Sequence, residues 1–594
     1  MTMTREARAE REAQVRQAQE LLFSGPETMS FAKALFFGQC LSEKLFPYPH
    51  PSAAEKAETD SLVNQVRAFC DEHLDPVEID RTSTIPADVV AGLGKLGLLG
   101  MTVPKPYGGR GMSQTAFCRA IEEIGARCGG TSVFVNAHLS IGLRALVLFG
   151  TEEQKTRWLP ALARGEKLAA FALTEPNAGS DAAGIETRAE LNPQGTHYIL
   201  NGGKQWITNG SIAGVLTVMA KTPVPSNGRM EPRVTAFLVT PDLPGFQVTA
   251  AALDKCGIRG TTTSKLEFSD MAVPVENVLG EVGKGLRVAL TVLDFGRTTF
   301  GASCTGTAKR LVGMAVEHAK TRRQFGRALA EFPLVKKKLA RMAAYAWAME
   351  SATYFTASLI DRGEEDYMVE TAILKVFACD ALWLIVNDAI QILGGRAYFT
   401  DLPYERMMRD ARINFIGEGS NEVLRCFIAL VGMRGVGENL RNVLGALKNP
   451  IGQFGTLSRF MRDRWDNFAR GPEVPVRSPR LQVHKAALEG LLGDFRSAVE
   501  RALRRYREEI IEEQYAQERI ADAAIELYVM SCVLAKLDWM LADGAGDSRR
   551  LERELTIGQY FCREAEQRVR RSLAELWNNY DAETTRVADS VTGA

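Results

Sequence analysis

The sequence predicts a mainly α-helical protein with a central antiparallel β domain. Apolar residues recur every three or four positions up to about residue 167, which is the spacing of amphipathic helices. From about residue 168 the pattern changes to short strand-like runs, and helical spacing returns after about residue 282. The chain has 594 residues, which is too many for one ordinary hydrophobic core, so several packed units are expected.

The N-terminal third is expected to be helical in two sections. Residues 1–50 begin with charges of both signs and are expected to form a helical segment, and residues 51–170 an N-terminal helical domain. In the second section, ETDSLVNQVRAFCDEHL and TAFCRAIEEIGARC carry apolar residues at helical spacing, and glycine pairs mark the turns.

Residues 171–282 are expected to form the middle β domain. Segments such as HYILNGGKQWITNG, VLTVMAKT, RVTAFLVTP and SKLEFSD are short and rich in Val, Thr, Phe and Ile. Gly, Pro, Asn or Asp separates them, as expected for turns between antiparallel strands. A helical unit is expected at 283–436 and a further helical extension at 437–594.

Composition excludes several classes of protein. Lys+Arg and Asp+Glu both number 72, so there is no basic field that would favour nucleic acid. The ten cysteines form no C-x-x-C pair and the six histidines show no metal-ligand spacing, which indicates a reducing compartment and no metal site. The N-terminus lacks an apolar signal core and contains acids, so we expect a bacterial cytoplasmic protein and leave a mature mitochondrial form open.

Three segments carry residue types suited to flavin and proton chemistry. In FALTEPNAGSD, a strand from Phe171 ends in a turn that presents backbone N–H groups, a hydroxyl and a carboxylate, as anion-binding turns do. In WITN, Trp206 offers a stacking face and Thr208 a hydrogen bond to a planar ring. In FIGEGSNE, Glu418 stands between two glycines, so the backbone can turn sharply and project the carboxylate into a cleft.

Together with DFGR, RRQFGR and QILGGRAYF, in this order and spacing, these segments resemble the signatures of the acyl-CoA dehydrogenase family. The resemblance implies an N-terminal helical domain, a β-barrel-like middle domain and a C-terminal four-helix bundle that carries the base, Glu418. It also implies FAD as cofactor. The implied FAD-binding residues are Phe171, Leu173, Thr174, Gly179, Ser180, Trp206, Ile207, Thr208, Arg322, Gln324, Phe325, Gln391, Leu393, Gly394, Gly395, Ser420, Asn421 and Glu422. The implied substrate-binding residues are Ser180, Asp294, Arg297, Glu418 and Gly419.

Two positions qualify the resemblance. Ala397 stands where the family usually has glycine, which is tolerated if the backbone φ is negative and strained if φ is positive. Some family members carry the base just before the arginine of D-x-x-R, and that position is Gly296 here, so the assignment falls on Glu418. Ser420 and Asn421 are expected to cap the helix that follows.

The family reaction is α,β-dehydrogenation of an acyl-CoA. The resemblance implies that Glu418 removes the α-proton while the flavin accepts a hydride, with electrons passed on to an electron-transferring flavoprotein. SFAKALFFGQC and the 438–594 extension resemble the branch that holds very-long-chain acyl-CoA dehydrogenase and acyl-CoA dehydrogenase family member 9, which implies a homodimer and long acyl chains. An acyl-CoA oxidase and an assembly role in respiratory-complex biogenesis are the alternatives.

Residues 438–470 suggest a peripheral membrane contact. This segment places Leu, Val, Phe and Trp among six Arg or Lys residues with few acids, which is typical of helices on anionic bilayers. A helix that packs only on the rest of the extension has the same pattern, so both readings stay open.

Overall fold

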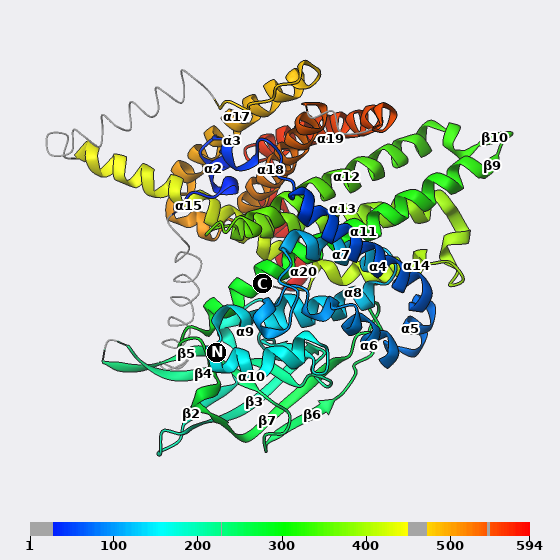
Figure 1. Ribbon diagram of the computed structural model, residues 1–594. Coiled ribbons are helices and arrows are strands. Elements are labelled where there is room, and N and C mark those ends of the chain that lie inside the picture. Colours follow the sequence, from blue (N-terminus) through cyan, green and yellow to red (C-terminus); the bar gives the residue numbers. More distant parts are fainter. Residues whose placement is uncertain (1–27, 227, 449–471, 543–546, 594) are drawn as a thin grey trace.

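The computed structural model (Figure 1) describes residues 28–226, 228–448, 472–542 and 547–593. In the view of Figure 1 the β domain lies at the bottom, long helices cross the middle, and the C-terminal extension lies at the top. The predicted fold class, mainly helical with a central and mostly antiparallel sheet, is confirmed.

The N-terminal helical domain begins at a capping box, in which Ser52 and Glu55 exchange side-chain and backbone hydrogen bonds. Its helical elements are α4 (Ala53–His73), α5 (Pro76–Thr82), α6 (Ala87–Lys95), η1 (Leu98–Gly100), η2 (Lys105–Tyr107), α7 (Gln114–Gly125), α8 (Gly129–Asn136), the π-helix η3 (Ala137–Gly142), α9 (Leu143–Phe149) and α10 (Glu152–Ala163). Gly129–Phe149 is long and apolar enough to cross a membrane, but 72% of that window is buried, as in a core helix of a soluble protein.

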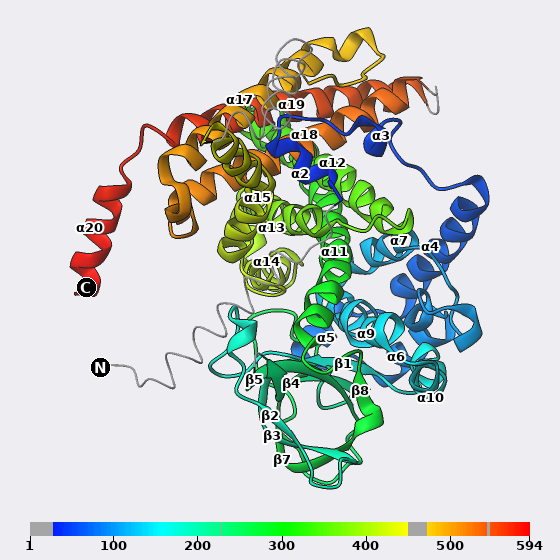
Figure 2. The same ribbon diagram turned by 90° about the vertical axis from the view of Figure 1, so that its left-hand side faces the viewer.

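Eight strands form the β domain, in the order β6-β7-β3-β2-β4-β5-β8, with β1 paired to β4. Figure 2 shows them curling into a ring, which gives the middle domain its barrel-like form. β1 and β2 run parallel to β4, and the other pairs are antiparallel. The strands are β1 (Ala169–Ala172), β2 (Arg188–Leu191), β3 (His197–Thr208), β4 (Val215–Ser226), β5 (Arg229–Val239), β6 (Phe246–Ala250), β7 (Thr263–Pro274) and β8 (Val278–Leu279); the short helices η4 (Ala182–Gly184) and η5 (Val275–Asn277) lie between them.

Long helices form the bundle, and α11 (Gly285–Thr321) and α13 (Met368–Leu393) supply much of its buried core. The last of them, α15 (Asn421–Lys448), continues without interruption through residue 436, where the sequence placed a domain boundary. The other elements are the hairpin β9 (Arg323–Gln324) and β10 (Arg327–Ala328), η6 (Leu329–Glu331), α12 (Pro333–Asp361), η7 (Gly394–Tyr398), α14 (Tyr404–Arg412), η8 (Ile413–Phe415) and α15 (Asn421–Lys448).

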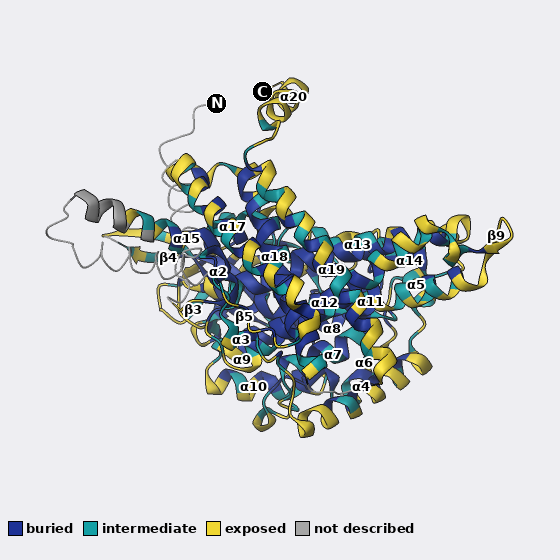
Figure 3. Ribbon diagram, turned by 90° about the horizontal axis from the view of Figure 1, so that it is seen from above, coloured by how far each residue is buried: buried dark blue, intermediate teal, exposed yellow. Residues whose placement is uncertain are grey.

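The extension packs on the bundle together with the start of the described chain. Phe36 meets Phe495 edge to face at 5.1 Å between ring centroids, and Phe31 meets Tyr528 at 6.0 Å. Figure 3 shows α18 mostly buried and α20 exposed. The elements are α2 (Phe31–Phe36), α3 (Ser42–Leu45), η9 (Pro479–Leu481), α17 (Gln482–Tyr506), η10 (Arg507–Ile511), α18 (Gln514–Ala542), α19 (Ser548–Glu575) and α20 (Asp581–Thr592).

The segment predicted to touch a membrane is described only in part. Residues 438–448 form the end of α15, and 449–471 lie outside the described residues. The membrane contact therefore stays a prediction.

A buried histidine joins the N-terminal helical domain to the β domain. His138 Nδ1 accepts a hydrogen bond from Ala169 N (3.0 Å), so Nε2 carries the proton and donates to Leu99 O (3.0 Å) and Leu162 O (3.2 Å). The imidazole is neutral in this arrangement. Burial lowers the pKa of His138 to about 4, although the two carbonyls oppose the shift.

Because His138 is neutral in the folded protein, we predict that the protein becomes less stable as the pH is lowered. Because the pKa of His138 in the folded protein lies below its unfolded value, only the unfolded chain gains a proton between about pH 6.5 and 4, which removes up to about 3 kcal/mol. The apparent melting temperature, measured by fluorescence from pH 7 to 5, should fall with a steeper slope than in His138→Gln. The exposed-site control His73→Gln should keep the wild-type slope. Equal slopes in all three proteins would contradict a neutral His138.

Candidate active site

The predicted base lies in a strained turn. Glu418 has φ +58° and Gly419 φ +96°, so two consecutive residues adopt left-handed conformations. A non-glycine residue in this region is uncommon and costs on the order of 1–3 kcal/mol. The turn connects η8 to α15, and its geometry directs the Glu418 side chain inward.

The Glu418 carboxylate faces α11 at a glycine. A Cβ placed on Gly296 would lie 2.9 Å from both carboxylate oxygens, so only glycine leaves room for them. Oε2 is buried and has no hydrogen-bond partner among the described residues. Burial raises the pKa of Glu418 to about 7, although Arg297 and Lys375 lower it. A carboxylate with this pKa is a suitable proton acceptor near neutral pH.

The two possible positions of a base meet at one place. Gly296 is where the alternative base of some relatives would stand, and it directly contacts the carboxylate that Glu418 sends from the other side. A base attached to either element would occupy similar space. In this chain Glu418 fills it, which supports the assignment made from the sequence.

Asp294 and Arg297, predicted to hold substrate, form a buried ion pair beside this turn. Arg297 Nη1 donates to Asp294 Oδ1 at 3.0 Å, and Thr371 Oγ1 donates to the same oxygen at 2.7 Å. Burial raises the pKa of Asp294 to about 6, against the effect of Arg297. Arg297 Nε is buried and has no partner in the described part of the chain, so this guanidinium can still accept a ligand.

The FALTEP turn is held by an ion pair that the sequence did not indicate. Lys204 Nζ, fully buried, donates to Glu175 Oε1 (2.6 Å) and Leu173 O (3.0 Å), and the Glu175 carboxylate also accepts from Thr187 N. Burial lowers the pKa of Lys204 to about 8. Gln205 N donates to Thr174 O at 2.9 Å, so the pair and this bond join the turn to the WITN strand.

Trp206 is presented for contact rather than packed in the core. It has φ +61° at a bulge between β3 and β7, and 59% of its surface is exposed. An exposed aromatic ring on a strained backbone is a candidate ligand surface. Ile207 points into the core, and Thr208 is half-buried.

The remaining cofactor predictions at this edge differ in exposure. Phe171 is buried, Leu173 and Thr174 are half-buried, and Gly179 and Ser180 are exposed. A Cβ on Gly179 would meet nothing within 4 Å, so the backbone there is open to a bound group. The turn and the WITN strand therefore fit a planar cofactor with attached phosphates.

A second group of predicted residues lies at the far end of the bundle. Arg322, Gln324 and Phe325 occupy the exposed hairpin at the tip of α11, where Phe325 is 94% exposed at φ +49° (Figure 1). Arg322, Leu393 and Gly395 line one pocket of about 690 Å³. Gln391 and Gly394 are exposed beside it. A Cβ would meet nothing at Gly394 or Gly395, which leaves their backbone accessible.

The departure at Ala397 is harmless. Its φ is not positive and its side chain is fully buried in the bundle core. Arg409 and Asp410, which follow this segment on α14, make structural contacts: Arg409 pairs with Asp80 at 2.7 Å, and Asp410 Oδ1 accepts from Ile258 N at 2.5 Å. They join α14 to the N-terminal and β domains.

The three predicted residues that follow Gly419 lie in two different environments. Ser420 Oγ accepts weakly from Val423 N at 3.4 Å, as a cap does, and Glu422 is exposed. The expectation that Asn421 is a cap is wrong, because its side chain is buried and accepts from Lys375 Nζ at 2.8 Å. Sequence reasoning missed Lys375; the signal was a lone lysine inside the apolar run TAILKVFACDAL.

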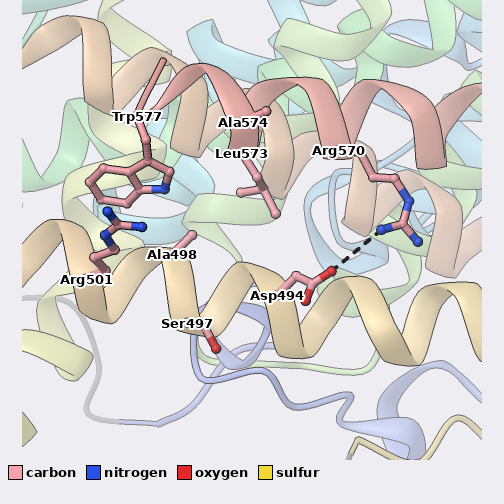
Figure 4. Close-up of a pocket in the computed structure, with 8 residues that line it drawn as sticks. All are labelled: Asp494, Ser497, Ala498, Arg501, Arg570, Leu573, Ala574 and Trp577. Atoms are coloured by element: carbon pink, nitrogen blue, oxygen red, sulfur yellow. Dashed lines mark ion pairs between the residues drawn. The ribbon is translucent and has the colours of Figure 1, made fainter. Parts of the chain in front are cut away.

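A separate groove lies in the extension between α17 and α19 (Figure 4). It measures about 390 Å³, and Arg501 stacks over Trp577 at 4.0 Å while Arg570 approaches Asp494 at 3.7 Å. None of the predicted site residues lines it. The groove is therefore not the active site.

Comparison with known families places the chain. Residues 56–166, 170–271 and 283–432 match the N-terminal, middle and C-terminal domains of acyl-CoA dehydrogenase, and residues 479–593 match the ACAD9/ACADV C-terminal domain. The very long-chain specific acyl-CoA dehydrogenase of Rattus norvegicus is 38% identical over 563 residues, which cover 93% of this chain and 85% of that protein.

Solved structures agree. The structure of an acyl-CoA dehydrogenase complexed with FAD from Bacillus anthracis matches with a TM-score of 0.78 at 32% identity, over 93% of this chain and 94% of that one. A structure described as the electron transferring flavoprotein of Acidaminococcus fermentans matches with a TM-score of 0.59 at 34% identity, over 63% and 97%.

Fold and matches together define a flavoprotein oxidoreductase. The chain belongs to the acyl-CoA dehydrogenase family, which uses FAD, and this confirms the predicted family, enzyme class and cofactor.

The close approach at Gly296 generates a prediction. Gly296→Ala should displace the Glu418 carboxylate, because the new methyl group would lie within 3 Å of both oxygens, and should lower kcat by about tenfold or more while flavin content is retained. Gly313→Ala is the matched control, since it lies on the same helix and its Cβ would meet nothing within 4 Å. Turnover with an artificial electron acceptor measures both. Unchanged kcat in Gly296→Ala would mean that the carboxylate works elsewhere.

Proposed function

We propose that this protein is an FAD-dependent dehydrogenase that converts long- or very-long-chain acyl-CoA to trans-2-enoyl-CoA, with Glu418 as the base. The observation that carries the proposal is the Glu418 carboxylate, which is held in a strained turn with a pKa of about 7 and without a hydrogen-bond partner for Oε2 in the described residues. The similarity to a very long-chain specific enzyme over 93% of the chain supports the substrate class.

FAD would be held by the FALTEP turn, the WITN strand and the pocket at Arg322 and Gly395, and when bound it would accept the β-hydride of the substrate. An aliphatic α-proton is weakly acidic, so the thioester oxygen must be polarised as the proton leaves. The backbone N–H of Glu418 is the group that this chain offers for that bond. Glu418 then takes the α-proton, and its burial excludes water from the exchange.

The exposed hairpin supports a homodimer. Phe325, at 94% exposure, and the pocket lined by Arg322 and Gly395 lie at the same end of the bundle, so a second copy is proposed to complete the flavin site there. We further propose an electron-transferring flavoprotein as acceptor, and a bacterial cytoplasmic location with peripheral membrane contact through residues 438–470; relatives include bacterial and mitochondrial proteins. Glu438, the first residue of that segment, is exposed on α15, which supports access to it.

The base is tested by Glu418→Gln. The amide keeps the size of the side chain but cannot accept the α-proton, so the rate of flavin reduction by palmitoyl-CoA should fall by about 10²–10⁴-fold while the protein stays yellow. Glu438→Gln, an exposed change on α15 away from the turn, should retain full activity. Near-normal turnover in Glu418→Gln would reject Glu418 as the base.

Substrate length and acceptor are tested together. Relative kcat/KM over acyl-CoAs from about C4 to C20 should rise to a maximum at about C14 or longer, because each added CH₂ contributes roughly 0.8 kcal/mol of binding where the protein buries it. A maximum near C4 would contradict the proposed substrate class. Hydrogen peroxide formed in equal amount with enoyl-CoA would instead show an oxidase.

A further inference from the structure

Lys375 is a fully buried lysine on α13 that points at the catalytic turn. Its Nζ donates to Gly419 O at 2.7 Å and to Asn421 Oδ1 at 2.8 Å. It therefore binds Gly419 and Asn421, which lie one and three positions after Glu418. Burying an ammonium group costs several kcal/mol unless it is well bonded, so a fully buried lysine with two short bonds to one turn suggests a specific role there.

The conformation of this turn requires support from neighbouring groups. Glu418 and Gly419 both have positive φ, and a segment in this conformation persists only where its surroundings hold it. The bond from Lys375 to Gly419 O fixes the peptide between Gly419 and Ser420, the second peptide after the base. On α11, Gly296 leaves just enough room for the carboxylate, so the position of the carboxylate is restricted there as well.

The charges around the base come from two helices. Arg297 on α11 and Lys375 on α13 both lower the pKa of Glu418. Within the described chain, Cys304 and Cys379 are the other titratable groups that face both Lys375 and Glu418. Burial lowers the pKa of Lys375 itself, and the thiols and Glu418 oppose that shift. Burial also keeps the pKa of both thiols high, so Lys375 and Arg297 are the cations that act on the base.

The hydrogen bonds around Lys375 are part of a network that extends to the C-terminal extension. Asn421 Nδ2 donates to Asp380 Oδ1 at 3.1 Å, and Arg425 Nη2 donates to Asp380 Oδ2 at 2.6 Å. Arg425 Nε donates in turn to Asp522 Oδ1 on α18 at 2.7 Å. One relay therefore leads from the extension to the turn that holds the base.

We propose that Lys375 is a positioning residue for Glu418, and that the extension helps to keep Lys375 in register through Asp522, Arg425, Asp380 and Asn421. This inference rests on the proposed role of Glu418. It assigns the extension a part in catalysis, as the far anchor of the catalytic turn, in addition to its packing on the bundle.

Lys375→Met and Lys375→Arg separate position from charge. Removing the positive charge destabilises the ionised carboxylate, so the acidic limb of the pH profile of kcat/KM should move to higher pH in Lys375→Met, by about half a unit or more. We expect kcat to fall by roughly tenfold or more as the turn loosens. Lys375→Arg keeps the charge but not the compact bond geometry, so its limb should stay near the wild-type pH while kcat still falls.

The relay is tested at its outer end, where Asp522 is half-buried. Asp522→Asn weakens the pair with Arg425 and should lower kcat by a few-fold, with the limb and KM unmoved, because Lys375 keeps its charge. Asp494→Asn is the control: it is another acid of the extension that faces an arginine, Arg570 (Figure 4), but it is exposed, lies outside the relay and should leave kcat unchanged.

The outcomes distinguish this inference from the proposed function. An inactive Glu418→Gln with an unmoved limb in Lys375→Met would overturn the role of Lys375 and leave the base intact. Lower thermal stability in Lys375→Met with wild-type kcat and limb would show a merely structural lysine. Equal kcat in Asp522→Asn and Asp494→Asn would show that the extension has no part in positioning Lys375. If Lys375→Met fails to fold, Lys375→Arg and Asp522→Asn still decide the case.

Discussion

The burial of one carboxylate in a left-handed turn is the constraint on which the rest of the site depends. A buried carboxylate oxygen that has no hydrogen-bond partner within the described ranges is costly, and so is a glutamate with φ +58°. Both costs must be met by rigid surroundings. Three bundle helices supply them: α11 provides clearance at Gly296, α13 provides Lys375, and α15 begins directly after the turn.

Rigid surroundings in turn explain why so many polar groups are buried around the bundle. Glu350 on α12 pairs with Lys309 on α11 (3.3 Å) and Lys536 on α18 (3.4 Å), which ties the extension to the bundle. Asp294, Arg297 and Thr371 tie α11 to α13. Buried pairs such as Asp294–Arg297 and half-buried ones such as Glu350–Lys536 add little net stability, but they hold elements in one register, which a strained catalytic turn requires.

Much of this organisation follows from local patterns in the sequence. Helical and strand periodicity predicted the order of the units. Glu418 was identified by the resemblance of FIGEGSNE and the other segments to family signatures, because a glutamate between two glycines is by itself usually a surface residue. Lys375 and Lys204 could not be found in this way, because their partners are distant in sequence and only the packed fold brings them together. The same reason hid Asn421, which has the composition of a cap but serves as an acceptor for a buried lysine. The boundary placed at residue 436 lies inside α15, because helical spacing continues there although the composition changes.

The mechanism requires that burial hold the pKa of Glu418 at about 7, against the opposing charges of Arg297 and Lys375. Its most direct test is the pH dependence of flavin reduction in a single turnover, followed by stopped-flow absorbance at substrate concentrations well below KM. The second-order rate constant should rise with pH through an apparent pKa of about 7 and then level off. A rate constant that is flat from pH 5 to 9, or a limb near the ordinary glutamate value of about 4.3, would contradict the account.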